Sequence, residues 1–248
     1  MFDLIAFDAD DTLWHNERLY RMGRERFHHI LVKYHLPDTT EAIDERVNQT
    51  ELQNLRYYGY GVMSFVLSLI EASVELTGGR ISATDIEDLL KLSKEMLTDP
   101  IELFASAEET VARLSTGYPL MLITKGDLLH QQAKVDQSGL RRYFRYVEVV
   151  SDKSQGTYAG ILSRLAVHPS RFLMVGNSLR SDILPVIQLG GWAIHIPAEL
   201  SWSHEHVDAD GALGDRCFEL GHLRDLPAFV DGLATSTGHR PEATGHRP

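Results

Sequence analysis

Five short apolar runs, each followed by polar residues, divide the chain. The first covers residues 4–7, and the others cover residues 119–124, 146–151, 172–177 and 192–197. Strands that are almost continuously apolar are typical of a parallel sheet covered on both faces. The runs therefore predict five strands of such a sheet.

Segments with helical spacing of apolar residues separate the later runs. They cover residues 107–115, 128–138, 156–166 and 180–189. Asp127 directly precedes the second segment and is predicted to be its N-cap. Because strands and helices alternate, the fold class is predicted to be α/β, with a doubly wound parallel sheet.

A long insertion separates the first predicted strand from the others. The chain runs 114 positions from Asp10 to Thr124, but only 29 from Thr124 to Lys153 and 29 from Lys153 to Asp182. After one ordinary helix is allowed for, an insertion of about 85 residues remains. Helical patterns cover residues 16–34, 40–56, 62–76 and 84–97 of it, with glycines or a proline between them. An all-helical inserted domain is predicted.

Polar residues that can carry chemistry follow the predicted strands. They are Asp8, Asp10, Thr12, Thr124, Lys153 and Asp182. The carboxyl ends of parallel strands meet at one edge of a sheet, so these side chains are expected to converge there. Three of them have a structural alternative when taken singly. Thr124 could be a residue that ends a strand, Lys153 a solvated lysine, and Asp182 a residue of a first helical turn.

Taken together, these residues resemble the four motifs of the haloacid dehalogenase-like hydrolase superfamily. The matching residues, in order, are Asp8, Asp10 and Thr12 in motif one, Thr124 in motif two, Lys153 in motif three and Asp182 in motif four. The resemblance implies a Rossmann-like core of residues 1–14 and 100–232 with a helical type-one cap of residues 15–99. Residues 235–248 lack apolar content and are expected to form a disordered tail.

The resemblance implies a phosphatase that acts through an aspartyl-phosphate. Asp8 would be the nucleophile, and Asp10 would protonate the leaving oxygen and then deprotonate the attacking water. Thr124 and Lys153 would contact the transferring phosphoryl group. Mg²⁺ would be held by the side chains of Asp8 and Asp182 and by the main-chain carbonyl of Asp10.

Two supporting residues and one exclusion follow from the same motifs. Thr12 is expected to brace the turn after the first strand. Asn177 stands where many members of the superfamily carry an acidic residue, and it would be a neutral metal ligand, either directly or through a water molecule. The dehalogenases of the superfamily lack an acid at the position of Asp10; since halide leaves without a proton whereas an alkoxide needs one, dehalogenation is not expected.

Four further residues are candidate substrate contacts. Tyr58 and Tyr60 belong to a segment, residues 57–61, that contains three tyrosines and two glycines. This segment fits a substrate-facing loop or an ordinary connection between helices. Arg56 could meet a second anionic group of the substrate or remain solvated. Lys125 could steady the turn after its strand or reach the substrate.

Charge and cysteine content narrow the partners. The formal net charge is −11 without a basic stripe, which argues against a nucleic acid polymer as partner. Cys217 is the single cysteine, so no internal disulfide can form, and the sequence begins with a core strand instead of a signal peptide. No run is long enough to cross a membrane. A cytoplasmic protein is expected.

The predicted function is Mg²⁺-dependent hydrolysis of a small phosphorylated metabolite, such as a sugar phosphate, phosphoglycolate or a nucleotide monophosphate. One alternative is a phosphotransferase or phosphomutase, in which a substrate hydroxyl replaces water. Another is a non-catalytic binding protein that retains the fold. The sequence leaves the substrate and the oligomeric state open.

Overall fold

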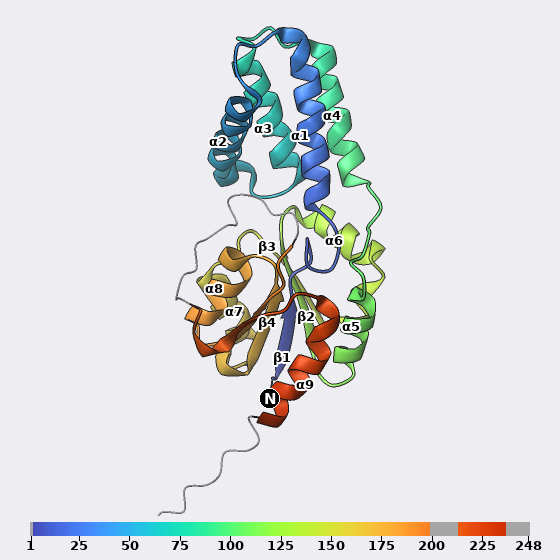
Figure 1. The fold of residues 1–248 in the computed structure, drawn as a ribbon, viewed down its shortest axis with the longest axis vertical. Coiled ribbons are helices and arrows are strands. Elements are labelled where there is room, and N and C mark those ends of the chain that lie inside the picture. The colour runs from blue at the N-terminus through green and yellow to red at the C-terminus, as the bar shows by residue number, and fades with distance from the viewer. Residues whose placement is uncertain (1, 199–212, 237–248) are drawn as a thin grey trace, which may run out of the picture.

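A six-stranded parallel sheet forms the centre of the molecule (Figure 1). The computed structural model describes residues 2–198 and 213–236. The strands are β1 (Leu4–Phe7), β2 (Leu120–Lys125), β3 (Tyr146–Val150), β4 (Phe172–Gly176), β5 (Trp192–His195) and β6 (Cys217–Glu219). The five predicted strands and the doubly wound fold class are confirmed. The sequence analysis missed β6, which is too short at three residues to show a pattern.

Helices cover both faces of this sheet, as Figure 1 shows. One face packs against α5 (Ala107–Ser115), α6 (Leu128–Gln137) and α9 (Leu226–Ser236), and the other against α7 (Gln155–Arg164) and α8 (Leu184–Gln188). Successive side chains of β1 alternate, with Ile5 and Phe7 in the first core and Leu4 and Ala6 in the second. Because both faces are buried, the strand sequence is apolar throughout.

The sheet order is β3-β2-β1-β4-β5-β6, with all neighbouring strands parallel. From β1 the chain passes to β2 and β3 on one side, and then returns to β4 on the other side of β1. Ligands of open α/β sheets bind at such a switch point, outside the carboxyl ends of the strands. Asp8 follows β1 directly, and Asn177 follows β4.

Four helices form the insertion between β1 and α5. They are α1 (Glu17–Leu31), α2 (Thr40–Tyr58), α3 (Val62–Leu76) and α4 (Ala83–Leu97). They stack above the carboxyl ends of the strands in Figure 1 and have a hydrophobic core of their own, which includes Phe27, Val47 and Leu89. We call these four helices and their connections the helical insertion. None of the described helices is long and apolar enough to cross a membrane.

The predicted domain limits, residues 1–14 with 100–232 and residues 15–99, stay a prediction. The predicted tail, residues 235–248, falls almost entirely outside the described residues. Its first two residues instead end α9. The predicted helix 180–189 also differs, because its first part is a π-helical turn, Leu179–Ile183, before α8 begins.

A buried carboxylate of α4 is held by side chains of the 3₁₀ turn Val32–Tyr34, which follows α1. Asp85 is 1% exposed and accepts hydrogen bonds from Lys33, Tyr34 and the Ser82 hydroxyl. Burial raises the pKa of Asp85, but the hydrogen bonds from Lys33, Ser82 and Tyr34 outweigh this effect and hold it at about 2. The ionised carboxylate therefore stabilises the packing of the insertion.

We expect Asp85→Asn to lower the free energy of unfolding at pH 7 by about 1–3 kcal/mol, because hydrogen bonds to a buried charged group are lost. The pKa of Asp85 in the folded state lies below its usual value of 3.8. Its contribution is therefore complete above about pH 4 and is lost as the pH falls toward 2. In urea unfolding experiments, the difference in the free energy of unfolding between wild type and Asp85→Asn should become smaller as the pH falls from 7 to 3. Glu87→Gln, at an exposed position of α4, is the control, and a difference that does not change with pH would contradict this account.

Candidate active site

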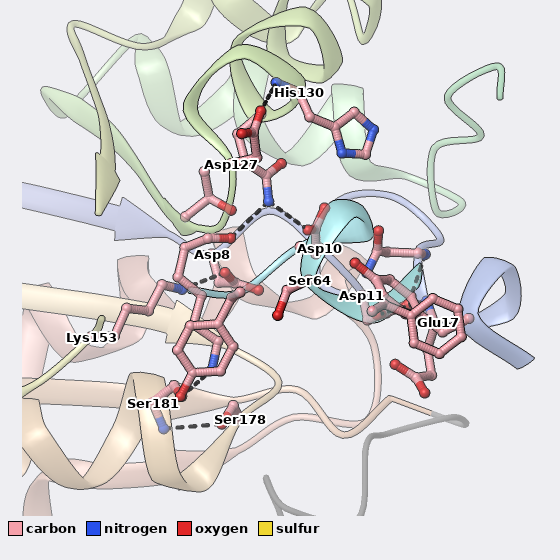
Figure 2. Close-up of a pocket in the computed structure, with 18 of the residues that line it drawn as sticks. Asp8, Asp10, Asp11, Glu17, Ser64, Asp127, His130, Lys153, Ser178 and Ser181 are labelled. Carbon is pink, nitrogen blue, oxygen red and sulfur yellow. Dashed lines mark hydrogen bonds and ion pairs between the residues drawn. The ribbon is translucent and has the colours of Figure 1, made fainter. Parts of the chain in front are cut away.

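A pocket lies at the carboxyl ends of the central strands, below the helical insertion (Figure 2). Residues after β1, β2, β3 and β4 line it from the side of the sheet, and residues of α1, α2 and α3 line it from the insertion. The predicted residues Asp8, Asp10, Thr124, Lys153 and Asp182 all line this one pocket. The structure thus brings together the chemistry-bearing residues that the sequence places far apart.

A buried lysine joins two carboxylates at the base of the pocket. The Lys153 ammonium donates to Asp8 Oδ1 and, at 2.7 Å, to Asp182 Oδ1. Lys153 is 3% exposed and Asp182 1%. Burial raises the pKa of Asp8, and the Lys153 charge opposes this effect. Burial lowers the pKa of Lys153, but Asp182 and Asp8 outweigh it and raise that pKa. The lysine is therefore charged, and it stabilises the carboxylate form of Asp8.

Close backbone approach places Asp182 beside β4. A Cβ atom at Gly176 would lie 2.3 Å from Asp182 Oδ2, so this position admits only glycine without a shift of the carboxylate. The Ser178 main-chain N–H donates to the same oxygen at 3.1 Å. The π-helical turn is closed by the hydrogen bond from Ile183 N to Ser178 O at 3.3 Å. Together these contacts direct the Asp182 carboxylate toward Lys153.

Oxygen atoms suited to a hard cation gather on the other side of Asp8. The Thr12 hydroxyl donates to Asp8 Oδ2 at 3.1 Å and to Asn177 Oδ1 at 3.2 Å. The end of the Asn177 amide lies 3.2 Å from Asp8 Oδ2 and 3.3 Å from the Asp10 main-chain oxygen. If the amide oxygen occupies this position, it faces two other oxygens, and a cation bound between them would offset their repulsion. With the amide turned by 180°, its NH₂ donates to both.

The composition of this oxygen cluster fits Mg²⁺. Among the described residues, no three His, Cys, Asp or Glu side chains gather as a metal site. The cluster instead combines the Asp8 carboxylate with the Asp10 main-chain carbonyl and the Asn177 amide oxygen. Mg²⁺ prefers oxygen ligands and commonly takes only one or two carboxylates, with waters in the remaining positions. The donors present therefore suit this ion better than a zinc-type site, which needs nitrogen or sulfur.

Three donors hold the Asp10 carboxylate in place. Oδ1 accepts from Trp14 Nε1 at 2.6 Å and pairs with Lys134 Nζ at 2.5 Å, while Oδ2 accepts from Gln131 Nε2 at 2.8 Å. Burial raises the pKa of Asp10, but the Lys134 charge and these hydrogen bonds outweigh it and lower that pKa. In this structure Asp10 is a carboxylate.

The sequence analysis missed Trp14, Gln131 and Lys134. One signal could have indicated the last two, because they lie three residues apart on the helix that follows Thr124 and thus share one face of it. The predicted N-cap of this helix is confirmed, since the Asp127 side chain accepts from His130 N at 2.9 Å. This cap orients α6 with Gln131 and Lys134 toward the pocket.

Lys125 connects the strand end to the helical insertion. Its Nζ donates to Ser181 Oγ at 2.9 Å and lies 4.3 Å from the centre of the Tyr60 ring. Both Lys125 and Tyr60 line the pocket, as does Thr124, which is 1% exposed at the end of β2. These positions are consistent with their prediction as substrate-side residues.

Arg56 and Tyr58, the other two candidate substrate contacts, do not line the pocket. Both are exposed, and the Arg56 guanidinium lies 4.6 Å from the centre of the Tyr57 ring. The reason is that α2 continues to Tyr58 and turns its last residues outward, before the chain reverses at Gly59 with φ of 69°. Within residues 57–61, Tyr60 and Gly61 reach the pocket.

A family model described as haloacid dehalogenase-like hydrolase matches residues 2–190. A solved structure described as a haloacid dehalogenase-like family hydrolase, from Xanthomonas campestris, is 38% identical. It covers 96% of this chain and 94% of its own, with a TM-score of 0.84. The glyceraldehyde 3-phosphate phosphatase of Methanothermobacter thermautotrophicus is 24% identical over 91% of this chain and all of its own length. The human N-acylneuraminate-9-phosphatase is 26% identical over 72% of this chain and 75% of its own.

We expect Lys153→Met to lower the free energy of unfolding by about 3–5 kcal/mol, because two buried carboxylates lose their cation. Urea unfolding should be measured with EDTA present, so that no divalent ion replaces the ammonium. Lys94→Met, at an exposed position of α4, is the control. Equal stability of the two variants would show that Lys153 does not neutralise Asp8 and Asp182.

Proposed function

Because the chain belongs to the haloacid dehalogenase-like hydrolase family, we propose that it is a Mg²⁺-dependent phosphatase acting on a small phosphorylated metabolite. The observation that carries this proposal is the position of Asp8, which is buried beside Lys153 and faces the pocket at the switch point of the sheet. The names of the two phosphatase relatives support the same reaction.

Asp8 is the proposed nucleophile. Its carboxylate attacks phosphorus, a bond from Asp8 to phosphorus forms, and the bond from phosphorus to the leaving oxygen breaks. Lys153 is within hydrogen-bonding distance of Asp8, so its charge reduces the repulsion between this carboxylate and an anionic phosphate. Thr124, at the end of β2, donates a hydrogen bond to a phosphoryl oxygen.

The proposed metal ligands are the Asp8 and Asp182 carboxylates, the Asp10 main-chain carbonyl and the Asn177 amide oxygen. When bound there, Mg²⁺ supplies positive charge to the phosphate oxygens. Lys153 uses Oδ1 of Asp8, and Oδ2 of Asp8 lies on the side of Asn177. The two oxygens of the nucleophile thus have different neighbours, and Thr12 fixes this orientation through its hydrogen bond to Oδ2.

Asp10 is the proposed general acid and base. In the first step it gives its proton to the leaving oxygen, and in the second it takes a proton from the water that attacks the phosphorus of the aspartyl-phosphate. Lys134, Trp14 and Gln131 hold Asp10 as a carboxylate here, which is the form required before the second step. To deliver a proton, Asp10 must rotate away from Lys134 toward Asp8.

We expect Asp8→Asn to reduce phosphate release at least about 10³-fold, since an amide does not replace the carboxylate nucleophile.

Asp10→Asn should lower kcat by about 10²–10⁴-fold for alkyl phosphates and much less for p-nitrophenyl phosphate, whose leaving group needs little protonation. Asp152→Asn, at the exposed position next to Lys153, is the matched control. Equal losses on both ester types would argue against Asp10 as the acid. Phosphoryl transfer to an added alcohol in place of water would indicate a phosphotransferase.

We expect EDTA to abolish turnover and added Mg²⁺ to restore it, whereas Ca²⁺ should support little activity because it takes more ligands at longer distances. Asn177→Ala should raise the Mg²⁺ concentration needed for half-maximal activity by about 10-fold or more, in the range that loss of a metal-site partner commonly costs. Activity that is unchanged by the chelator, in protein shown to be metal-free by elemental analysis, would overturn the metal assignment.

A further inference from the structure

The wall that the helical insertion contributes to the pocket carries more acidic than basic groups. Its charged residues are Glu17 and Arg24 from α1 and Glu51 from α2. In Figure 2, Glu17 lies on the opposite side of the view from Lys153. The wall therefore contributes two carboxylates and one guanidinium to the part of the pocket that would hold the organic part of a phosphate ester.

The guanidinium of this wall is already neutralised. Arg24 Nη2 donates to the Glu51 carboxylate and, at 2.8 Å, to Asn48 Oδ1, and Nη1 lies 3.9 Å from Asp44 Oδ1. The side chains of Arg24 and Glu51 are 20% and 10% exposed, so solvent screens their pairing only in part. The carboxylates of Glu51 and Asp44 thus lie near the Arg24 guanidinium. A second anionic group of a substrate would therefore approach the Glu51 carboxylate as well as Arg24.

The other cations of the pocket come from the side of the sheet, with Lys153 and Lys125 at strand ends and Lys134 in α6. Lys153 is held between Asp8 and Asp182, Lys134 pairs with Asp10, and Lys125 follows Thr124. Lys153 and Lys134 lie beside the residues proposed to transfer the phosphoryl group, and Lys125 lies between Ser181 and the Tyr60 ring. The wall of the insertion differs from this side of the pocket, because the cation that it contributes, Arg24, is paired with Glu51.

Several side chains beyond the proposed phosphate position can accept a hydrogen bond. The Glu51 carboxylate, the Ser64 hydroxyl and the Tyr20 side chain line the pocket, as does Gln131. Of these groups, the Glu51 carboxylate accepts hydrogen bonds only, so a ligand that donates one is favoured there. Hydroxyl groups can donate, and carboxylates cannot.

The size of the pocket favours a compact substrate. Its volume is about 160 Å³. A cavity of roughly 150 Å³ admits a benzene-sized molecule. A phosphate ester with a remainder of a few carbons fits this space better than a nucleotide does.

We propose that Glu51, held by Arg24, makes the enzyme selective for compact phosphate esters whose remainder carries hydroxyl groups and no second anionic group. This proposal rests on the proposed function and adds the substrate class. Glu51 is the specificity residue: it accepts a hydrogen bond from a substrate hydroxyl and repels a substrate carboxylate. Arg24 is a positioning residue, because it acts by orienting Glu51.

Two matched pairs of esters test the proposal. Glycerol 3-phosphate and 3-phosphoglycerate differ by a terminal CH₂OH against a carboxylate, and so do 2-hydroxyethyl phosphate and 2-phosphoglycolate. The assays are run at pH 8, above the value of about 7 to which burial raises the pKa of Glu51. In each pair we expect kcat/KM to favour the hydroxyl member at least about tenfold, since like charges at close range in a partly buried site repel strongly.

Glu51→Gln keeps the shape of the side chain and removes its charge. We expect this variant to reduce the preference at least about fivefold, mainly through a lower KM for the acidic member, because Arg24 then faces the substrate carboxylate without its partner. Glu45→Gln, at an exposed position of the same helix, is the control and should keep the wild-type preference. Arg24→Gln removes the cation that orients Glu51 and opposes the burial-induced rise of its pKa, so it should also narrow the preference, and it serves as a second variant if Glu51→Gln does not fold.

Each outcome bears on a separate claim. Equal or better hydrolysis of the acidic members by the wild type would overturn the proposed selectivity and leave the phosphatase standing. A preference that Glu51→Gln retains in full would overturn the role of Glu51. If no ester is hydrolysed, the proposed function fails, and calorimetric binding of the same pairs to Asp8→Asn protein still decides the selectivity. Tighter binding of the hydroxyl members would support it, and equal, weaker or no binding would overturn it.

Discussion

The contact on which the site depends is the buried Lys153 ammonium between the carboxylates of Asp8 and Asp182. These residues follow β3, β1 and β4, so a single charge cluster joins three strand ends. Buried carboxylates are tolerated only when they are paired and hydrogen-bonded. The cluster therefore requires the strand order that the sheet has, with β1 at its centre. Gly176 belongs to the same constraint, because only glycine leaves room for the Asp182 carboxylate.

Two parts of the fold line the pocket, and they contribute different kinds of side chain. The strand ends supply Asp8, the proposed nucleophile, together with Lys153 and the oxygen atoms near Asp8 Oδ2, and α6 supplies Lys134. The helical insertion supplies a wall of aromatic and acidic side chains, in which the pairing of Arg24 with Glu51 sets the charge. Asp10 is close to both parts, since its carboxylate is tied to Lys134 and its main-chain oxygen lies beside Asn177.

Much of the fold could be predicted from the sequence because its signals are local. Apolar runs such as Leu120–Lys125 reflect burial on both faces of a sheet, and Asp127 caps α6 through a contact three residues away. By contrast, β6 is too short to carry a pattern, and the π-helical turn before α8 depends on packing beside β4. Arg56 and Tyr58 lie outside the pocket lining, because a shift of one or two residues along a helix decides whether a side chain faces the pocket or the solvent.

The sequence by itself determined the type of fold, the long helical insertion and the order of the chemical groups along the strand ends, because hydrophobic period and strand-end position are properties of neighbouring residues. Only the tertiary structure decided which groups meet. It paired Lys134, Trp14 and Gln131 with Asp10, and Arg24 with Glu51. These contacts join segments from different parts of the fold, and their partners are selected by side-chain direction, burial and charge balance, which no local pattern encodes.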